Sequence, residues 1–206
     1  MFHNRLDAAE RLAQALSQYQ GKNPLVLGIP RGAVPMARHI ATTLGGEVDV
    51  VLVRKLTSPY NPEFALGAVD ESGWMFVGDH AAHYGGTPEY LEEEKARQLE
   101  TMRQRRGQYT PIRPPFDPAG RIVIVVDDGL ATGSTMIAAL HALRAKKPAR
   151  VICAVPVAPP DTVEKVANYC DEMVCLETPW AFQAVGQFYQ EFPQVSDEEV
   201  VAALAN

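Results

Sequence analysis

The sequence predicts an α/β fold, in which a five-stranded, mostly parallel sheet is flanked by helices. Short apolar runs alternate with helical segments along most of the chain. One of them, Ile122–Val126, holds five consecutive β-branched residues, which is typical of a strand buried on both faces of a sheet. The 206 residues, 47% of them hydrophobic, are enough for one domain with a sizeable core. We therefore expect residues 1–206 to form a single domain.

The individual elements follow from periodicity and from end signals. Five apolar runs are expected to form the sheet: Leu25–Ile29, Val48–Val53, Ile122–Val126, Val151–Val155 and Glu172–Leu176. Helices are expected around and between them: 4–20, 35–45, 88–107, 134–145, 161–169 and 196–204. Asn4 is the expected N-cap of the first helix, which stops at Gly21. Ser196 and Glu199 predict a capping box for the last helix.

Residues 56–118 interrupt this alternation, and we expect them to form a lid, hairpin and helical insertion at one edge of the sheet. Two prolines and an asparagine predict a loop over Lys55–Pro62. Two apolar runs around the turn residues 70–73 predict a hairpin. Three arginines near the end of the charged helix are expected on a solvated face: Arg103, Arg105 and Arg106.

The composition excludes several classes of partner. A net charge of −6 and a pI of about 5.4 argue against a general nucleic-acid binder, although small anionic ligands need only local positive groups. No apolar run approaches the length of a membrane span, and the acidic, interrupted N-terminus is unlike a signal peptide. The three cysteines are sparse and odd in number, which fits a reducing compartment. We expect a cytoplasmic protein with neither nucleic-acid nor membrane partners.

The most informative segment joins a buried strand to a helix through acidic and then small residues. Asp127 and Asp128 follow the strand directly, and a seven-residue loop leads into the helix. A helix N-terminus offers unpaired N–H groups and a positive dipole end, which together favour a phosphate. The two carboxylates can accept hydrogen bonds from neighbouring hydroxyls, as in a ribose diol. The loop residues are Gly129, Leu130, Ala131, Thr132, Gly133, Ser134 and Thr135.

Two alternatives compete with a ribose 5-phosphate site at this segment. A Walker-type nucleotide site also has a strand ending in acids, but it requires a GxxxxGK[ST] loop, which the chain lacks. A plain strand–turn–helix connection with a good N-cap is the other alternative.

The segment VVDDGLATGST resembles the phosphoribosyl-pyrophosphate signature of type I phosphoribosyltransferases. The resemblance extends over nearly the whole chain and is closest to stand-alone predicted phosphoribosyltransferases of unassigned substrate. It implies that Asp127 and Asp128 hold the ribose 2- and 3-hydroxyls, while Gly129–Thr135 wraps the 5-phosphate. It also implies a flexible lid and a hood formed by residues 177–206.

Two further motifs end the first and second expected strands, at the carboxyl edge where open α/β sheets bind ligands. Arg31 and Gly32 lie in GIPRG, which is similar to the family's pyrophosphate loop. Arg54 and Lys55 lie in VRK, which is similar to the pair that opens the family's catalytic loop. Taken alone, each cation is equally well explained as a solvated surface residue.

The resemblance implies an enzyme that moves a phosphoribosyl group from phosphoribosyl pyrophosphate to a nitrogen base and releases pyrophosphate. Arg54, Lys55, Asp127 and Asp128 would be catalytic. Mg²⁺ would be carried by the substrate, and a carboxylate oxygen of Asp127 or Asp128 would be its contact on the protein. A non-enzymatic sensor that binds the same donor or a nucleotide and regulates a partner stays open, as does a homo-oligomer.

The sequence narrows the choice of acceptor base but does not identify the base. Ala131 stands where the hypoxanthine-guanine branch of the family has an acid, and Val155–Pro160 lacks that branch's lysine. We therefore expect negligible turnover with hypoxanthine or guanine as the acceptor. Five aromatic residues of the tail are expected mainly to anchor it on the domain, with base stacking as the alternative: Trp180, Phe182, Phe188, Tyr189 and Phe192.

Overall fold

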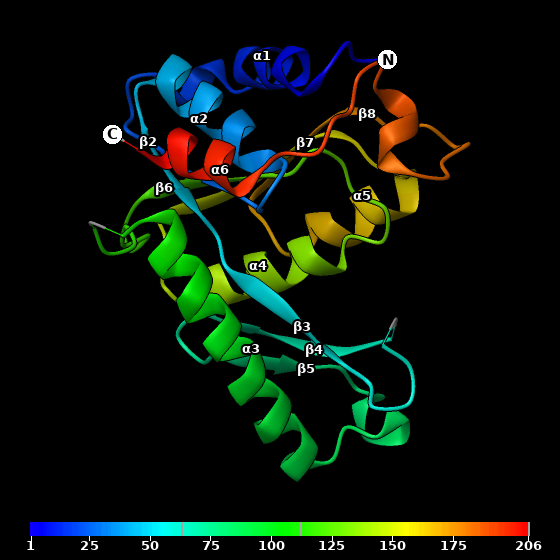
Figure 1. The fold of residues 1–206 in the computed structure, drawn as a ribbon. Coiled ribbons are helices and arrows are strands. Elements are labelled where there is room, and N and C mark those ends of the chain that lie inside the picture. Colours follow the sequence, from blue (N-terminus) through cyan, green and yellow to red (C-terminus); the bar gives the residue numbers. More distant parts are fainter. Residues whose placement is uncertain (63, 112, 206) are drawn as a thin grey trace.

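A computed structural model describes residues 1–62, 64–111 and 113–205. Its main sheet has five parallel strands (Figure 1), as the apolar runs predict. The strand order β2-β1-β6-β7-β8 places the first half of the chain at one edge and the last strand at the other. The strands are β1 (Leu25–Gly28), β2 (Glu47–Val50), β6 (Ile122–Val126), β7 (Arg150–Val157) and β8 (Glu172–Glu177).

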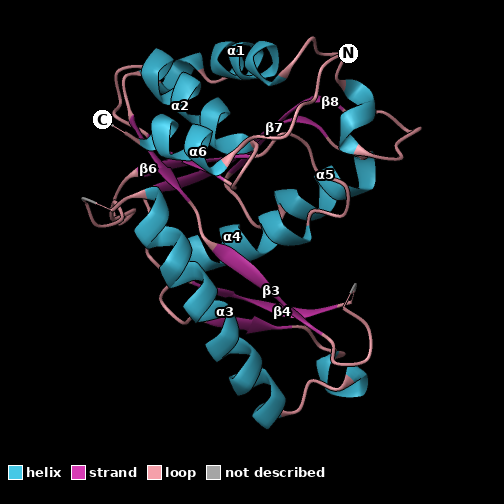
Figure 2. Cartoon of the chain, viewed as in Figure 1, coloured by secondary structure: helices cyan, strands magenta, loops and turns pink. Residues whose placement is uncertain are grey.

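Helices cover both faces of this sheet (Figure 2), because side chains of each buried strand alternate between two apolar layers. Ile124 of β6 packs in the layer under α1, α2 and α6, whereas Val123 and Val125 pack in the layer under α4. The helices of the first layer are α1 (Arg5–Ala15), α2 (Ala33–Leu44) and α6 (Asp197–Leu204). Those of the second are α4 (Ser134–Arg144) and α5 (Pro160–Ala167).

The predicted N-caps form as expected, whereas the first helix ends at Ala15 rather than at Gly21, because a separate 3₁₀ turn follows over Ser17–Tyr19. The Asn4 side chain accepts a hydrogen bond of 2.9 Å from the Asp7 backbone N–H and caps α1. Ser196 and Glu199 form the reciprocal capping box of α6. In the described residues, no helix combines the length and apolar composition that crossing a membrane requires.

The insertion departs from the expectation at its start. The second strand of the main sheet ends at Val50 rather than Val53, and Lys55 lies in a strand rather than a loop. The reason is non-local pairing: Arg54 pairs with Val69 and Leu56 with Gly67, and Leu56 is fully buried. A second, antiparallel sheet therefore forms from β3 (Val53–Thr57), β4 (Ala65–Asp70) and β5 (Met75–Val77).

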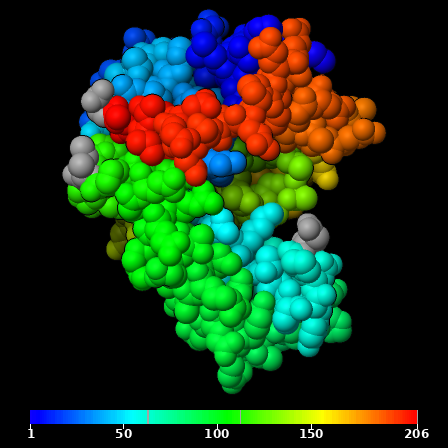
Figure 3. Space-filling view, viewed as in Figure 1, coloured from blue at the N-terminus to red at the C-terminus, as the bar shows by residue number. Residues whose placement is uncertain are grey.

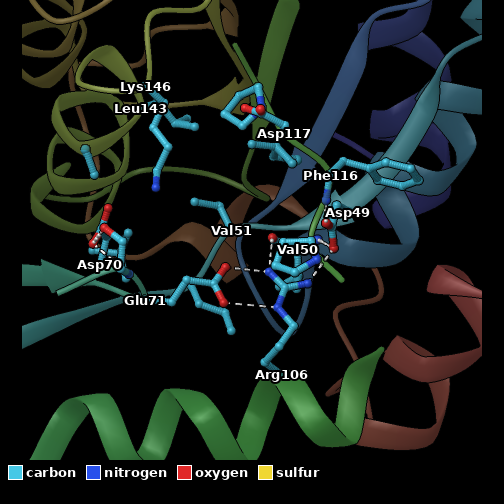
Figure 4. Close-up of a pocket in the computed structure, with 17 residues that line it drawn as sticks. Asp49, Val50, Val51, Asp70, Glu71, Arg106, Phe116, Asp117, Leu143 and Lys146 are labelled. Atoms are coloured by element: carbon cyan, nitrogen blue, oxygen red, sulfur yellow. Dashed lines mark hydrogen bonds and ion pairs between the residues drawn. The ribbon is translucent and has the colours of Figure 1, made fainter. Parts of the chain in front are cut away.

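The long helix α3 (Pro88–Tyr109) fastens the insertion to the main sheet. Arg106 donates hydrogen bonds of 2.8 Å to Asp49 of β2 and 2.6 Å to Glu71 of the β4–β5 turn. These groups border a cavity of about 390 Å³ (Figure 4). Arg106 is therefore not on a solvated face, contrary to the expectation, because two distant carboxylates converge on it.

Short 3₁₀ helices complete the chain: Ser17–Tyr19, Ala81–Tyr84 and Val185–Phe188. The last of these lies in the C-terminal tail, which returns to the N-terminus after β8 (Figure 1). The backbone N–H of Phe2 donates a hydrogen bond of 2.8 Å to the Phe188 carbonyl, and that of Gln190 donates one of 2.9 Å to the Phe2 carbonyl.

Candidate functional site

The acid pair lies at the carboxyl end of β6, the central strand of the sheet. Both side chains are half-buried, and the Asp128 backbone N–H donates a hydrogen bond of 2.9 Å to Oδ1 of Asp127. Burial, together with the charge of Asp128, raises the pKa of Asp127 well above its ordinary value. The two acids thus occupy different environments although they are neighbours in sequence.

Asp128 is held by groups that the sequence analysis did not identify. Arg5, the first residue of α1, forms an ion pair of 3.1 Å from Nε to Oδ2 of Asp128. The Tyr189 hydroxyl donates a hydrogen bond of 2.6 Å to the Asp128 carbonyl. No local motif marks Arg5, and Tyr189 was expected mainly to anchor the tail, with base stacking as the alternative. Both reach Asp128 because the N-terminal segment pairs with the tail at Tyr189.

The glycines of the loop after Asp128 permit close packing. Gly129 has a φ of 155°, and a Cβ there would lie 2.6 Å from a Val185 methyl. Gly133 adopts the left-handed conformation (φ 79°) just before α4, and a Cβ there would lie 2.9 Å from a Val166 methyl. A side chain at either position would push the loop away from the tail or from α5.

The loop is anchored by backbone groups while its hydroxyls stay accessible. Leu130 is buried, and its N–H donates a hydrogen bond of 2.9 Å to the Val157 carbonyl. The Ala131 carbonyl accepts one of 2.7 Å from the Thr162 hydroxyl. Oγ1 of Thr132 lies 2.7 Å from Oγ of Ser134, beside the start of α4. We call residues 127–135 the acid loop.

The expected cations meet in a cavity of about 520 Å³ beside the acid loop. Arg31 reaches it from the turn after β1, and Arg54 and Lys55 reach it from β3. Arg105 of α3 and Thr135 of the acid loop also line it. Arg105 was expected on a solvated face, and the folding of α3 against β3 places it here instead. We call this the cation cavity; Figure 3 shows the surface hollowed where the insertion meets the rest of the molecule.

One carboxylate faces these cations. Oδ1 of Asp197, the first residue of α6, lies 3.8 Å from Nη1 of Arg31 and 3.9 Å from Nη1 of Arg105. It also accepts a hydrogen bond of 3.1 Å from the Tyr109 hydroxyl. Asp197 therefore neutralises part of the positive charge of the cation cavity.

The turn after β1 reaches both parts of the site. Arg31 faces the cation cavity, and the adjoining Pro30–Arg31 peptide bond is cis. Gly32 lies against the acid pair, since a Cβ there would be 2.6 Å from Oδ2 of Asp128 and 2.9 Å from Nε of Arg5. Glycine at position 32 thus lets the turn approach the acids closely.

Four of the five tail aromatics pack against the core of the domain, as expected: Phe182, Phe188, Tyr189 and Phe192. Phe182 and Phe188 stack with centroids 5.2 Å apart, and Tyr189 lies 4.7 Å from Phe192. Trp180 differs, because 90% of it is exposed.

Comparison with known proteins settles the family. The sequence model of the family described as the phosphoribosyl transferase domain matches residues 2–191 of this chain. The chain belongs to this phosphoribosyl transferase family. A Thermus thermophilus protein of known structure, TT1426, is 47% identical, with a TM-score of 0.88 over 98% of this chain and 97% of that one. The purine phosphoribosyltransferase of Pyrococcus horikoshii Ot3 shares the fold at 16% identity, with a TM-score of 0.50 over 93% of each chain.

Two proteins of Mycobacterium tuberculosis, from strains CDC 1551 and H37Rv, each carry the name "Putative phosphoribosyl transferase". Both are 43% identical over 99% of this chain. The chain spans 46% of the length of these relatives, about half. The expected family and the five-stranded fold of this phosphoribosyl transferase domain are therefore confirmed, while the roles of its individual site residues stay predictions.

Proposed function

We propose that this phosphoribosyl transferase domain binds 5-phosphoribosyl-1-pyrophosphate and transfers its phosphoribosyl group to a nitrogen base. The observation that carries the proposal is the meeting of the acid loop and the cation cavity at one edge of the sheet. Thr135 belongs to both. A donor with a phosphate and a diol at one end and a pyrophosphate at the other matches this arrangement of charges.

In the proposed complex, the acid loop takes the ribose 5-phosphate half of the donor. The helix α4 begins at Ser134, so the N–H groups of its first turn and its dipole favour the 5-phosphate. Asp127 and Asp128 accept hydrogen bonds from the ribose hydroxyls, each bond contributing about 1.5–3 kcal/mol when the acceptor is charged. The closely packed glycines hold the loop in one conformation before the ligand arrives.

The cation cavity takes the pyrophosphate half. Arg31, Arg54, Lys55 and Arg105 line it, and their attraction grows as negative charge moves onto the departing pyrophosphate. The bond between ribose C1 and the pyrophosphate oxygen breaks with its electron pair leaving on oxygen. A nitrogen lone pair of the base forms the new bond at C1, so positioning and electrostatics suffice and no side chain need act as a nucleophile.

The residues present fit the Mg²⁺ that the family implies. Asp127 and Asp128 offer the hard carboxylate oxygens that Mg²⁺ prefers. Bound with the donor, the ion would neutralise charge on the pyrophosphate.

The test is calorimetric binding of phosphoribosyl pyrophosphate with Mg²⁺, followed by pyrophosphate release with a panel of bases. We expect Lys55→Ala to leave ribose 5-phosphate affinity nearly unchanged and to slow pyrophosphate release at least about tenfold, since about 1.4 kcal/mol of barrier is tenfold in rate. Lys22→Ala removes an exposed lysine just before β1, at the opposite edge of the sheet, and serves as the control. Tight donor binding with neither hydrolysis nor transfer on any base would favour the sensor instead.

A further inference from the structure

The N-terminal segment and the tail segment 188–193 meet beside the acid pair. Phe2 forms a parallel bridge with Tyr189, and their rings lie 5.6 Å apart. The Glu191 N–H donates a hydrogen bond of 2.8 Å to the His3 carbonyl. The beginning of α1 and the tail after β8 are therefore held together as one structural unit, with Arg5 at their junction.

The Arg5 guanidinium is engaged on several sides. Nε pairs with Oδ2 of Asp128, and Nη1 donates a hydrogen bond to the Pro193 carbonyl. Its central carbon lies 3.9 Å from the centre of the Phe192 ring, within the range of a cation–π interaction. Only 15% of the Arg5 side chain and 18% of the Asp128 side chain are exposed. These contacts fix the orientation of the guanidinium.

Asp128 is confined by the same junction. Gly32 lies so close that a Cβ would come within 2.6 Å of Oδ2, and Tyr189 bonds to the Asp128 carbonyl. Arg5 occupies Oδ2, whereas among the described residues no backbone N–H and no basic or hydroxyl side chain donates to Oδ1. The neighbouring Asp127 carboxyl is the other side chain that interacts with the Asp128 carboxylate. The arrangement commits one carboxylate oxygen to Arg5 and leaves the other for a ligand.

We infer that Arg5 is a positioning residue, which holds Asp128 so that Oδ1 meets a ribose hydroxyl of the donor. The inference rests on the proposed function. A carboxylate without this partner would sample several rotamers, and only a fraction of them would present an oxygen to the sugar. Phosphate recognition by the N-terminus of α4 does not depend on that orientation. The two ligand groups can thus be separated experimentally.

The experiment measures the affinities of ribose 5-phosphate and inorganic phosphate by calorimetry in variants of the full chain. Arg5→Met should lower ribose 5-phosphate affinity at least about tenfold and change phosphate affinity less than about twofold. Arg5→Lys, which keeps the charge but not the planar fork, should recover part of the loss. Arg11→Met, on the exposed side of the same helix, should change neither affinity and is the matched control.

Phe192→Leu provides a second variant in case Arg5→Met does not fold. It removes the ring beside the guanidinium and keeps the ion pair, so a smaller, roughly threefold loss confined to ribose 5-phosphate is expected. Equal losses for both ligands, or unchanged ribose 5-phosphate affinity, would overturn the role of Arg5. If the wild-type protein does not bind ribose 5-phosphate, the proposed function fails and this inference falls with it. Binding by the wild type together with an unaffected Arg5→Met variant defeats only the inference.

Discussion

The acid loop and the cation cavity are built in opposite ways. The acid loop belongs to the central strand of the main sheet, and buried backbone bonds and close-packed glycines fix it. The cation cavity draws its basic side chains from a turn, from an antiparallel sheet and from a long helix. Arg31, Arg54 and Lys55 are all exposed. The first region is preorganised, whereas the charged groups of the second are held by surface partners such as Asp197 and Gln98 and can shift toward a ligand.

This difference has a physical consequence for a transferase. A sugar phosphate that keeps its charge during reaction is best held by groups that do not move. A leaving group that gains charge is best met by groups whose attraction increases as it departs. Substitutions in the acid loop should therefore weaken binding of the sugar phosphate, and substitutions in the cation cavity should act mainly on the leaving group.

The largest effect is expected for Gly133→Val. The left-handed backbone and the Val166 methyl 2.9 Å from a Cβ leave no room for the side chain, so the loop must move away from α5. Ribose 5-phosphate affinity should fall by about a hundredfold or more in calorimetry. Gly107→Ala is the control, because Gly107 lies in α3 with open space around its Cβ position. Unchanged affinity in Gly133→Val would remove the 5-phosphate from this loop.

The second-largest loss of affinity is expected for substitutions of the two acids. Asp127→Asn and Asp128→Asn should each weaken phosphoribosyl pyrophosphate binding about tenfold to a hundredfold, equivalent to one charge-assisted hydrogen bond. Inorganic phosphate affinity should change much less, because in the proposed complex the acids contact the diol and not the phosphate. Asp79→Asn, at an exposed site in the insertion, controls for the change in net charge. Comparable losses for both ligands would mean that the acids are structural or bind only metal.

A smaller loss is expected from Arg105→Met. One of four cations is removed from the cation cavity, so pyrophosphate affinity should fall about fivefold while ribose 5-phosphate affinity is retained. Arg103→Met is the matched control on the same helix, since that side chain is 74% exposed. A loss of ribose 5-phosphate affinity instead would show that the two regions are not separable.

Asp197→Asn should act in the opposite direction. Its carboxylate lies 3.8 Å from Arg31 and 3.9 Å from Arg105, and removing that charge frees both cations for an anion. Pyrophosphate affinity should rise about twofold to threefold, most clearly at low salt. Glu198→Gln makes the same charge change at an exposed neighbouring position and should have no such effect. A decrease in Asp197→Asn would assign the residue to binding.

The smallest effect concerns stability. Because the folded-state pKa of Asp127 is raised, the folded protein retains a proton that the unfolded chain releases. The contribution of Asp127 to the stability of the folded protein therefore falls as the pH rises from the ordinary aspartate pKa of 3.8 through the raised pKa. Asp127→Asn should gain thermal stability relative to the wild type as pH increases over this range. An equal offset at every pH would mean that Asp127 does not titrate abnormally.

The sequence by itself determined the main sheet and the acid loop. Apolar alternation is a local property, and a buried strand such as Ile122–Val126 can be identified without knowing its neighbours. The acid loop is likewise contiguous, so the order of acids, glycines and hydroxyls is already the order in which a sugar and a phosphate would meet them. The motifs around Arg31 and Lys55 could be found for the same reason.

Only the tertiary structure decided which distant groups complete these motifs. Arg5 and Tyr189 reach Asp128 because the N-terminal segment pairs with the tail, and Arg105 lines the cation cavity because α3 packs on β3. The error at Lys55 has the same origin, since β3 exists only through its pairing with β4. Contacts of this kind join residues that lie far apart in the chain. Such a contact stabilises the protein only when the fold has already brought both partners together, so no local sequence pattern predicts it.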